Sequence, residues 1–216
     1  MTLTRAGGFA ALVAAGTYLV GFALLLGVLE PAGFRTSGAD AAADIAFLAG
    51  NQALMVLWNL VIYVLNAVTL VVLAIALHAL LREGAPALAA VATAFGLIWA
   101  GLVLASGMVA NVGTEAVLAL NATDPAAAAT LWQAVGTVEN GLGGGNEITG
   151  GLWVLLLSLA ALRVGVLHKP LNWLGIAIGA AGLITVVPGM SDIGGPIFGL
   201  GFIVWFVWAG VALLRA

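Results

Sequence analysis

The second long apolar run of the chain contains three polar side chains in its interior. Asn59, Tyr63 and Asn66 follow one another at intervals of four and three residues, so in a helix they lie along one face. Polar groups inside a membrane span are unfavourable to bury, and they usually face the interior of a bundle and mark functional positions. This face is therefore the first candidate for a ligand-binding surface.

The glycine-rich segment 138–151 is a second candidate, because it contains Asn146 and Glu147 next to a long apolar run. If the segment is helical, its glycines and polar residues form two adjacent stripes that let another helix approach closely. Each glycine also weakens a helix by about 1 kcal/mol relative to alanine. The segment could instead break the helix and bind something with its free backbone groups, and the sequence leaves both alternatives open.

The functional hypothesis that follows is a small cavity, open to the outer side, in which these two polar regions meet. A structural hydrogen-bond network between two helices would explain the same residues without a ligand. Trp99, Trp153 and Trp205 fall near the middle of apolar runs, where aromatic rings could line a pocket or fill space between glycine-rich helices. The candidate ligand-binding residues are Asn59, Tyr63, Asn66, Asn146, Glu147 and Trp153.

The composition excludes several kinds of chemistry. Cysteine is absent, which excludes disulfides, thiolate metal sites, thiol catalysis and iron–sulfur clusters. His78 and His168 are too few for a membrane metal centre, and the only lysine, Lys169, falls in a turn, which argues against a Schiff base inside the bundle. The sequence has no nucleophile beside a base, no phosphate-binding loop and no dinucleotide fingerprint. We expect no metal and no cofactor, and no catalytic residue is assigned.

Membrane helices must position the candidate residues. The chain of 216 residues is 63% hydrophobic and 7% charged, whereas soluble domains have about 25% charged residues. Continuous apolar runs of about 20 residues favour helices over β-strands as the spanning elements. The sequence predicts an all-α transmembrane helical bundle, a single membrane domain over residues 1–216, with six spans at 7–29, 52–81, 86–110, 145–166, 171–190 and 195–214.

The basic residues predict that both ends of the chain face the cytoplasm. With the N-terminus inside, five of the six basic residues are cytoplasmic and only Arg35 lies outside, as the positive-inside rule requires. Eight of the nine acidic residues then lie on the outer side, which fits a solvated surface or a face that attracts cations. Nucleic acid is not expected as a partner, because the chain has no basic tail.

Two segments between the spans predict short helices on the outer surface. Ser37 and Asp40 have the spacing of a helix cap before an alanine-rich stretch that ends at Gly50. In the segment 113–140, Asp124 followed by Pro125 is a typical helix start.

The fourth and fifth predicted spans are joined in a characteristic way. A basic residue ends the fourth span, and a glycine, a short basic turn with a proline and a glycine-bearing fifth span follow. The residues concerned are Arg163, Gly165, Lys169, Pro170 and Gly175. In this pattern the chain resembles a family of bacterial six-span proteins, the domain of unknown function 4386, although there the proline is expected before the basic residue. The resemblance covers most of the chain and implies a multi-pass protein of the bacterial inner membrane, but no activity.

The leading functional hypothesis is a membrane protein that binds or moves a small apolar or weakly polar molecule. One alternative is a membrane-embedded enzyme that acts on a lipid or isoprenoid substrate, with Glu147 or Glu139 as acid or base. Another is a structural subunit of a membrane complex. Membrane lipids are expected partners in each case. The small-residue pair Gly175 and Gly179 indicates close helix packing, either within the chain or in a homo-oligomer.

Overall fold

The computed structural model describes residues 2–34, 40–144 and 147–215. Every element in these ranges is helical, so the predicted all-α class is confirmed. Three short segments are labelled η. Two of them, η1 and η2, are π-helical, with i→i+5 hydrogen bonds in place of i→i+4, whereas η3 contains the non-helical residue Gly143. The elements are α1 (Leu3–Leu24), η1 (Leu25–Leu29), α2 (Ala41–Gly50), α3 (Gln52–Asn59), η2 (Leu60–Leu65), α4 (Asn66–Leu81), α5 (Pro86–Asn121), α6 (Pro125–Glu139), η3 (Asn140–Gly144), α7 (Ile148–Val164), α8 (Lys169–Ile184) and α9 (Ser191–Arg215).

Proline and aspartate fix several helix starts. Helix α5 begins at Pro86 and α6 at Pro125, where the missing N–H group of proline has no helical partner to lose. The Asp124 carboxylate accepts a hydrogen bond from the Ala127 N–H at 3.0 Å. Asp40 caps α2 in the same way, so both predicted interspan helices form. Ser37, the other residue of the predicted cap, lies outside the described residues.

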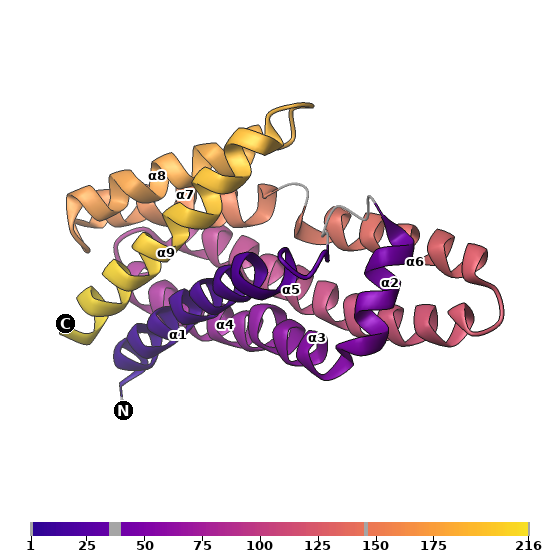
Figure 1. Ribbon diagram of the computed structural model, residues 1–216. Coiled ribbons are helices and arrows are strands. Elements are labelled where there is room, and N and C mark those ends of the chain that lie inside the picture. The colour runs from indigo at the N-terminus through magenta and orange to yellow at the C-terminus, as the bar shows by residue number, and fades with distance from the viewer. Residues whose placement is uncertain (1, 35–39, 145–146, 216) are drawn as a thin grey trace.

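The long helices form a bundle in which the two ends of the chain lie together (Figure 1). Helix α1 packs against α4 and α9, α7 packs against α5 and α8, and α8 also packs against α9. The short helix α2 crosses the bundle at the end remote from the termini (Figure 1). There the Trp132 N–H donates a hydrogen bond to Asp44 at 3.1 Å, which ties α2 to α6.

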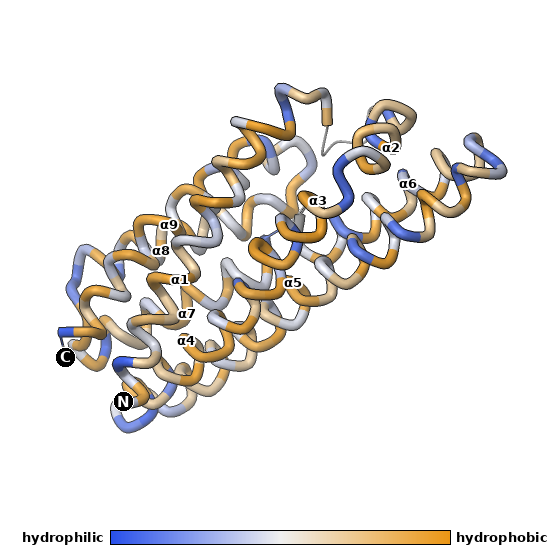
Figure 2. Tube along the Cα trace, turned by 60° about the horizontal axis from the view of Figure 1, so that its bottom comes forward, coloured by the Kyte–Doolittle hydropathy of each residue, from blue (hydrophilic) through white to orange (hydrophobic). Residues whose placement is uncertain are grey.

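Five helical stretches are long and apolar enough to cross a membrane. They are Leu3–Leu29, Gln52–Leu81, Pro86–Asn121, Pro125–Val164 and Ser191–Arg215, the fourth interrupted by residues outside the described ranges. Figure 2 shows hydrophobic residues along most of the length of these helices. This is a membrane protein of apolar helices, as the sequence indicates. The apolar helix α8, where the fifth span is predicted, has 16 residues and is shorter than the others.

Helix α5 extends well beyond the predicted third span, 86–110. It continues to Asn121, so residues 113–121, which the sequence analysis assigned to an outer surface segment, belong to α5. Gly113 allows this extension to pack closely against Val135 of α6, and no proline interrupts the chain between Pro86 and Pro125. Together α5 and α6 form a helical hairpin.

Close contacts between glycines join α7 to α8. A Cβ atom added at Gly151 would lie 2.9 Å from the Gly179 carbonyl oxygen, and one added at Gly179 would lie 2.7 Å from the Leu155 Cβ. Only small residues permit backbones to approach this closely. The stripe that begins at Gly175 therefore serves packing within the chain.

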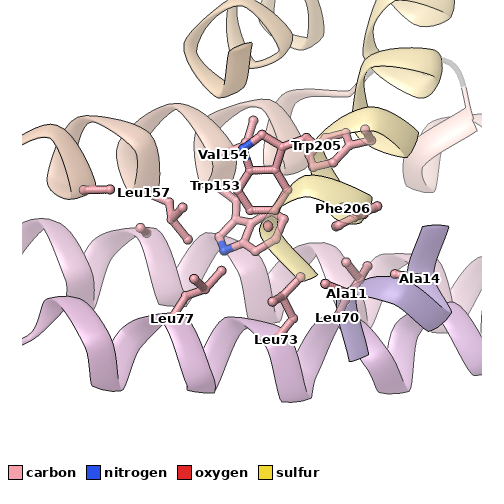
Figure 3. Close-up of a cluster of buried hydrophobic side chains, with 14 of the residues drawn as sticks. Ala11, Ala14, Leu70, Leu73, Leu77, Trp153, Val154, Leu157, Trp205 and Phe206 are labelled. Atoms are coloured by element: carbon pink, nitrogen blue, oxygen red, sulfur yellow. The ribbon is translucent and has the colours of Figure 1, made fainter. Parts of the chain in front are cut away.

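The centre of the bundle is an aromatic and aliphatic core (Figure 3). Trp153 and Trp205 are buried there, with ring centroids 5.7 Å apart in an edge-to-face arrangement. Such pairs stabilise beyond the area that they bury. Trp153 and Trp205 thus fill space between helices, the packing alternative of the sequence analysis.

Candidate functional site

A cavity of about 220 Å³ lies between α1, the π-helical segment η2, α5 and η3. It is smaller than the range of about 300–1,000 Å³ that is typical for drug-sized ligands. Its wall combines polar side chains with aromatic and aliphatic ones. The polar side chains are those of Thr17, Tyr18, Tyr63, Asn66 and Glu147.

Asn66 links the polar side of the cavity to α1. Its Nδ2 group donates a hydrogen bond to the Thr17 hydroxyl at 2.7 Å, and that hydroxyl in turn donates to the Ala14 carbonyl at 2.7 Å. Both polar side chains are almost fully buried. This network satisfies the hydroxyl and one amide proton of the pair and fixes the position of both side chains.

Tyr63 joins the cavity to the end of α6. Its hydroxyl donates a hydrogen bond to the Glu139 carboxylate, and Glu139 is the last residue of α6. Tyr63 itself belongs to η2 and lines the cavity. The carboxylate of Glu139 therefore lies directly behind a residue of the cavity wall.

Glu147 occupies the turn that starts α7. The sequence left open whether the glycine-rich segment is a helix or a break. In the structure it breaks the helix, with Gly143 in a non-helical conformation (φ 158°, ψ 7°). The Glu147 N–H donates a hydrogen bond to the Thr185 hydroxyl at 2.8 Å, which anchors the turn to the end of α8. Its side chain lines the cavity and makes no hydrogen bond to any described residue.

Aromatic side chains form much of the remaining wall. Trp58 donates its ring N–H to the Gly21 carbonyl of α1 at 3.3 Å, so its polar edge is already engaged. Trp99 lines the cavity. On the side of the core, its ring centroid lies 5.5 Å from that of Trp153 and 5.1 Å from that of Phe202. The cavity is thus backed by the rigid aromatic core.

The two π-helical segments and the break in η3 contribute to this wall. Leu25 belongs to η1, Ile62 and Tyr63 belong to η2, and Gly143 belongs to η3. Single π-helical turns are rare and often occur at functional sites. Their convergence distinguishes this cavity from the ordinary spaces between packed helices.

The structure brings together three of the six candidate residues. Tyr63, Asn66 and Glu147 line the same cavity. Asn59 points elsewhere and donates a hydrogen bond to the Asn111 side chain of α5 at 3.0 Å. Trp153 lies behind Trp99 in the core, and Asn146 lies outside the described residues. Whether the three cavity residues bind a ligand stays a prediction.

The contribution of α1 to the cavity was not predicted from the sequence. Thr17 and Tyr18 line the cavity. They are the only polar side chains between Arg5 and Glu30, so they interrupt an otherwise apolar run. That interruption was the available signal. Trp58, one residue before Asn59, was also overlooked as a lining residue.

His78 has a structural role, and the described residues include no metal-binding group. His78 of α4 lies 3.0 Å from the Thr93 hydroxyl of α5, through its Nδ1 atom, and so connects two adjacent helices. Within the described ranges, no cluster of three or more histidine, cysteine, aspartate or glutamate side chains could hold a metal ion.

Comparison with known proteins identifies a family but no characterised relative. The family described as a domain of unknown function, number 4386, matches residues 6–214. No curated protein and no solved structure matches the chain.

Proposed function

The chain belongs to the family called domain of unknown function 4386, and we propose that it binds a small, largely apolar molecule in the cavity between α1, η2, α5 and η3. The observation that carries this proposal is the wall itself. It unites an aromatic and aliphatic surface with a few polar groups, of which the Glu147 carboxylate makes no hydrogen bond to a described residue. Small-molecule sites typically have this composition, with few polar groups that set orientation.

The hydrogen bonds around the cavity support binding over simple helix packing. A network that only joined helices would pair its polar groups with one another, as Asn59 and Asn111 do. Glu147 differs, because it is fixed through its backbone while its carboxylate reaches the cavity. A half-buried carboxylate without a partner among the described residues is unfavourable, so an occupant that pairs with it would stabilise the site.

We further propose that α8 is a sixth span and that both chain ends are cytoplasmic. Helix α8 packs along α7 and α9, and the turn residues after Ile184 can extend its 16 residues towards the roughly 20 that a bilayer requires. The structure supports the orientation too, since segments that carry basic residues pack together although they are distant in the chain. Gly84, two residues after Arg82, packs on Val164, which follows Arg163, and Gly8, three residues after Arg5, packs on Leu214, which precedes Arg215. Positive charge at one end favours that end as the cytoplasmic one.

The binding proposal is tested by filling the cavity. Val103→Trp places a bulky ring at the wall, and Val112→Trp makes the same change on the same helix at a site that is 67% exposed. The proteins are extracted into native nanodiscs, and co-purifying small molecules are measured by untargeted mass spectrometry.

The proposal predicts a stoichiometric non-bulk molecule with the natural chain and with Val112→Trp, and its loss with Val103→Trp. The same bulk lipids in all three samples would contradict it and favour a structural subunit. A lipid or isoprenoid that is chemically altered by the natural chain but not by Glu147→Gln would instead support the membrane-embedded enzyme.

A further inference from the structure

The charge of the cavity wall is one-sided. Glu147 contributes a carboxylate, and the wall contains no lysine, arginine or histidine among the described residues. A second carboxylate, that of Glu139, accepts the Tyr63 hydrogen bond directly behind the wall. An occupant of this cavity therefore meets acidic side chains and phenol oxygen, and the described part of the wall offers no cation.

The aromatic part of the wall offers a second kind of attraction to a cation. Tyr18, Phe22, Trp58 and Trp99 line the cavity together with Tyr63. The faces of aromatic rings attract cations, most strongly for tryptophan, and ammonium groups are recognised in such aromatic surroundings. The Trp58 N–H is engaged by the Gly21 carbonyl, which leaves the ring of Trp58 as its surface for an occupant.

The same wall disfavours an occupant with an anionic group. A phosphate or carboxylate would lie near Glu147 without a basic partner on the described wall, and unpaired charge in an apolar site is strongly unfavourable. A zwitterionic phospholipid headgroup carries such a phosphate beside its ammonium. The wall therefore fits a free amine better than the headgroup of a membrane lipid.

We infer that the molecule in the cavity is an organic cation, an ammonium group on an apolar body without phosphate or carboxylate, with the ammonium held by Glu147 and the surrounding rings. This inference rests on the proposed function and adds the chemical class of the ligand. The ammonium supplies the partner that the Glu147 carboxylate lacks among the described residues, while the aliphatic residues Leu25, Ile62 and Val103 contact the apolar body.

Two probes of matched shape test the inference. Choline and 3,3-dimethylbutan-1-ol differ only in the positively charged nitrogen that replaces a carbon atom. Both are titrated by calorimetry into the full chain in phosphatidylglycerol nanodiscs, with empty nanodiscs as the reference. We expect choline to bind about tenfold more tightly than the alcohol, because an ion pair and ring contacts together supply at least that factor.

Two variants place the charge effect at Glu147. Glu147→Gln should reduce choline binding to the level of the alcohol, whereas Glu115→Gln, the same change at an exposed position of α5, should leave both affinities unchanged. Gel filtration verifies that each variant is folded. If Glu147→Gln does not fold, Phe22→Leu serves in its place and should weaken choline binding about threefold relative to the alcohol.

The outcomes separate this inference from the proposed function. Equal affinities for the two probes, unaffected by Glu147→Gln, would overturn the cationic class and leave the binding site intact. Binding of neither probe, together with no effect of Val103→Trp on co-purifying molecules, would overturn both. Repeating the choline titration in nanodiscs that contain phosphatidylethanolamine distinguishes the source of the ammonium. Unchanged affinity supports a free amine, and competition by the lipid would overturn that assignment.

Discussion

The amide of Asn66 and the hydroxyl of Thr17 are joined by a buried hydrogen bond of 2.7 Å that connects α4 to α1 beside the cavity. Both residues come from apolar runs and are 49 positions apart in the chain. The pair sets the position of the first helix relative to the second predicted span. Thr17 and Tyr18 reach the cavity because of this arrangement.

A double-mutant cycle measures the strength of this pair. Asn66→Leu and Thr17→Val should each destabilise the folded chain, and the coupling between them should be about 0.6 kcal/mol, as for other hydrogen bonds between membrane helices. The measurement is reversible unfolding in detergent. Additive effects of the two substitutions would show that the hydrogen bond contributes nothing to stability.

The hydrogen bond between Tyr63 and Glu139 predicts that the local stability of the end of α6 depends on the Tyr63 hydroxyl. Tyr63→Phe removes the hydrogen bond to the end of α6, so amide hydrogen exchange should become faster in residues 134–143, where α6 meets η3, and stay unchanged in α4. Tyr18→Phe is the matched control, because no hydrogen bond joins the Tyr18 hydroxyl to a described residue. Equal exchange in both variants would contradict the account.

Helical periodicity in the predicted span 52–81 placed three candidate residues on one face. Two of them, Tyr63 and Asn66, line the cavity, and the third, Asn59, does not. Asn59, Tyr63 and Asn66 share one face only if every turn has 3.6 residues. The segment Leu60–Leu65 is π-helical, and its wider turns shift the register between Asn59 and Asn66. Asn59 consequently contacts Asn111 of α5, while Tyr63 and Asn66 line the cavity.

Other features could not be derived from the chain alone. The glycine-rich segment allowed either a helix or a break, and the anchoring of Glu147 by Thr185 depends on a contact 38 residues away. Helix α5 continues past the apolar run that ends at residue 110, through Asn111 and Glu115 to Asn121, a length that apolar composition does not predict. By contrast, helix starts at Pro86, Asp124 and Asp40 followed from local chemistry, which does not depend on tertiary contacts.

Glycine packing between α7 and α8 makes a prediction about stability. Gly179→Ala places a Cβ atom 2.7 Å from the Leu155 Cβ and should destabilise the chain by about 1–3 kcal/mol through overpacking. Gly101→Ala, at a position on α5 with nothing within 4 Å of the added atom, should be neutral or stabilise by up to about 1 kcal/mol. Thermal unfolding compares the two. Similar losses in both variants would show that helix propensity, not packing, dominates.

The absence of cysteine permits a direct test of the six-span topology. Single cysteines replace the exposed residues Glu83, Thr123 and Asp192, and intact cells are treated with a maleimide that does not cross membranes. The proposed topology predicts labelling at Thr123→Cys and Asp192→Cys, and at Glu83→Cys only after permeabilisation. If α8 does not cross the membrane, Thr123→Cys is labelled in intact cells but Asp192→Cys is not.

Access to the cavity tests the central claim most directly. Val103→Cys puts a thiol on the cavity wall, and Ser106→Cys puts one at a buried position of the same helix that does not line the cavity. Both variants in nanodiscs are treated with methyl methanethiosulfonate, and the extent of modification and the co-purifying small molecules are followed by mass spectrometry. A binding cavity predicts rapid modification of Val103→Cys, little of Ser106→Cys, and release of the bound molecule as Val103→Cys is modified. An unreactive Val103→Cys, or full modification with no change in what the protein holds, would contradict the claim.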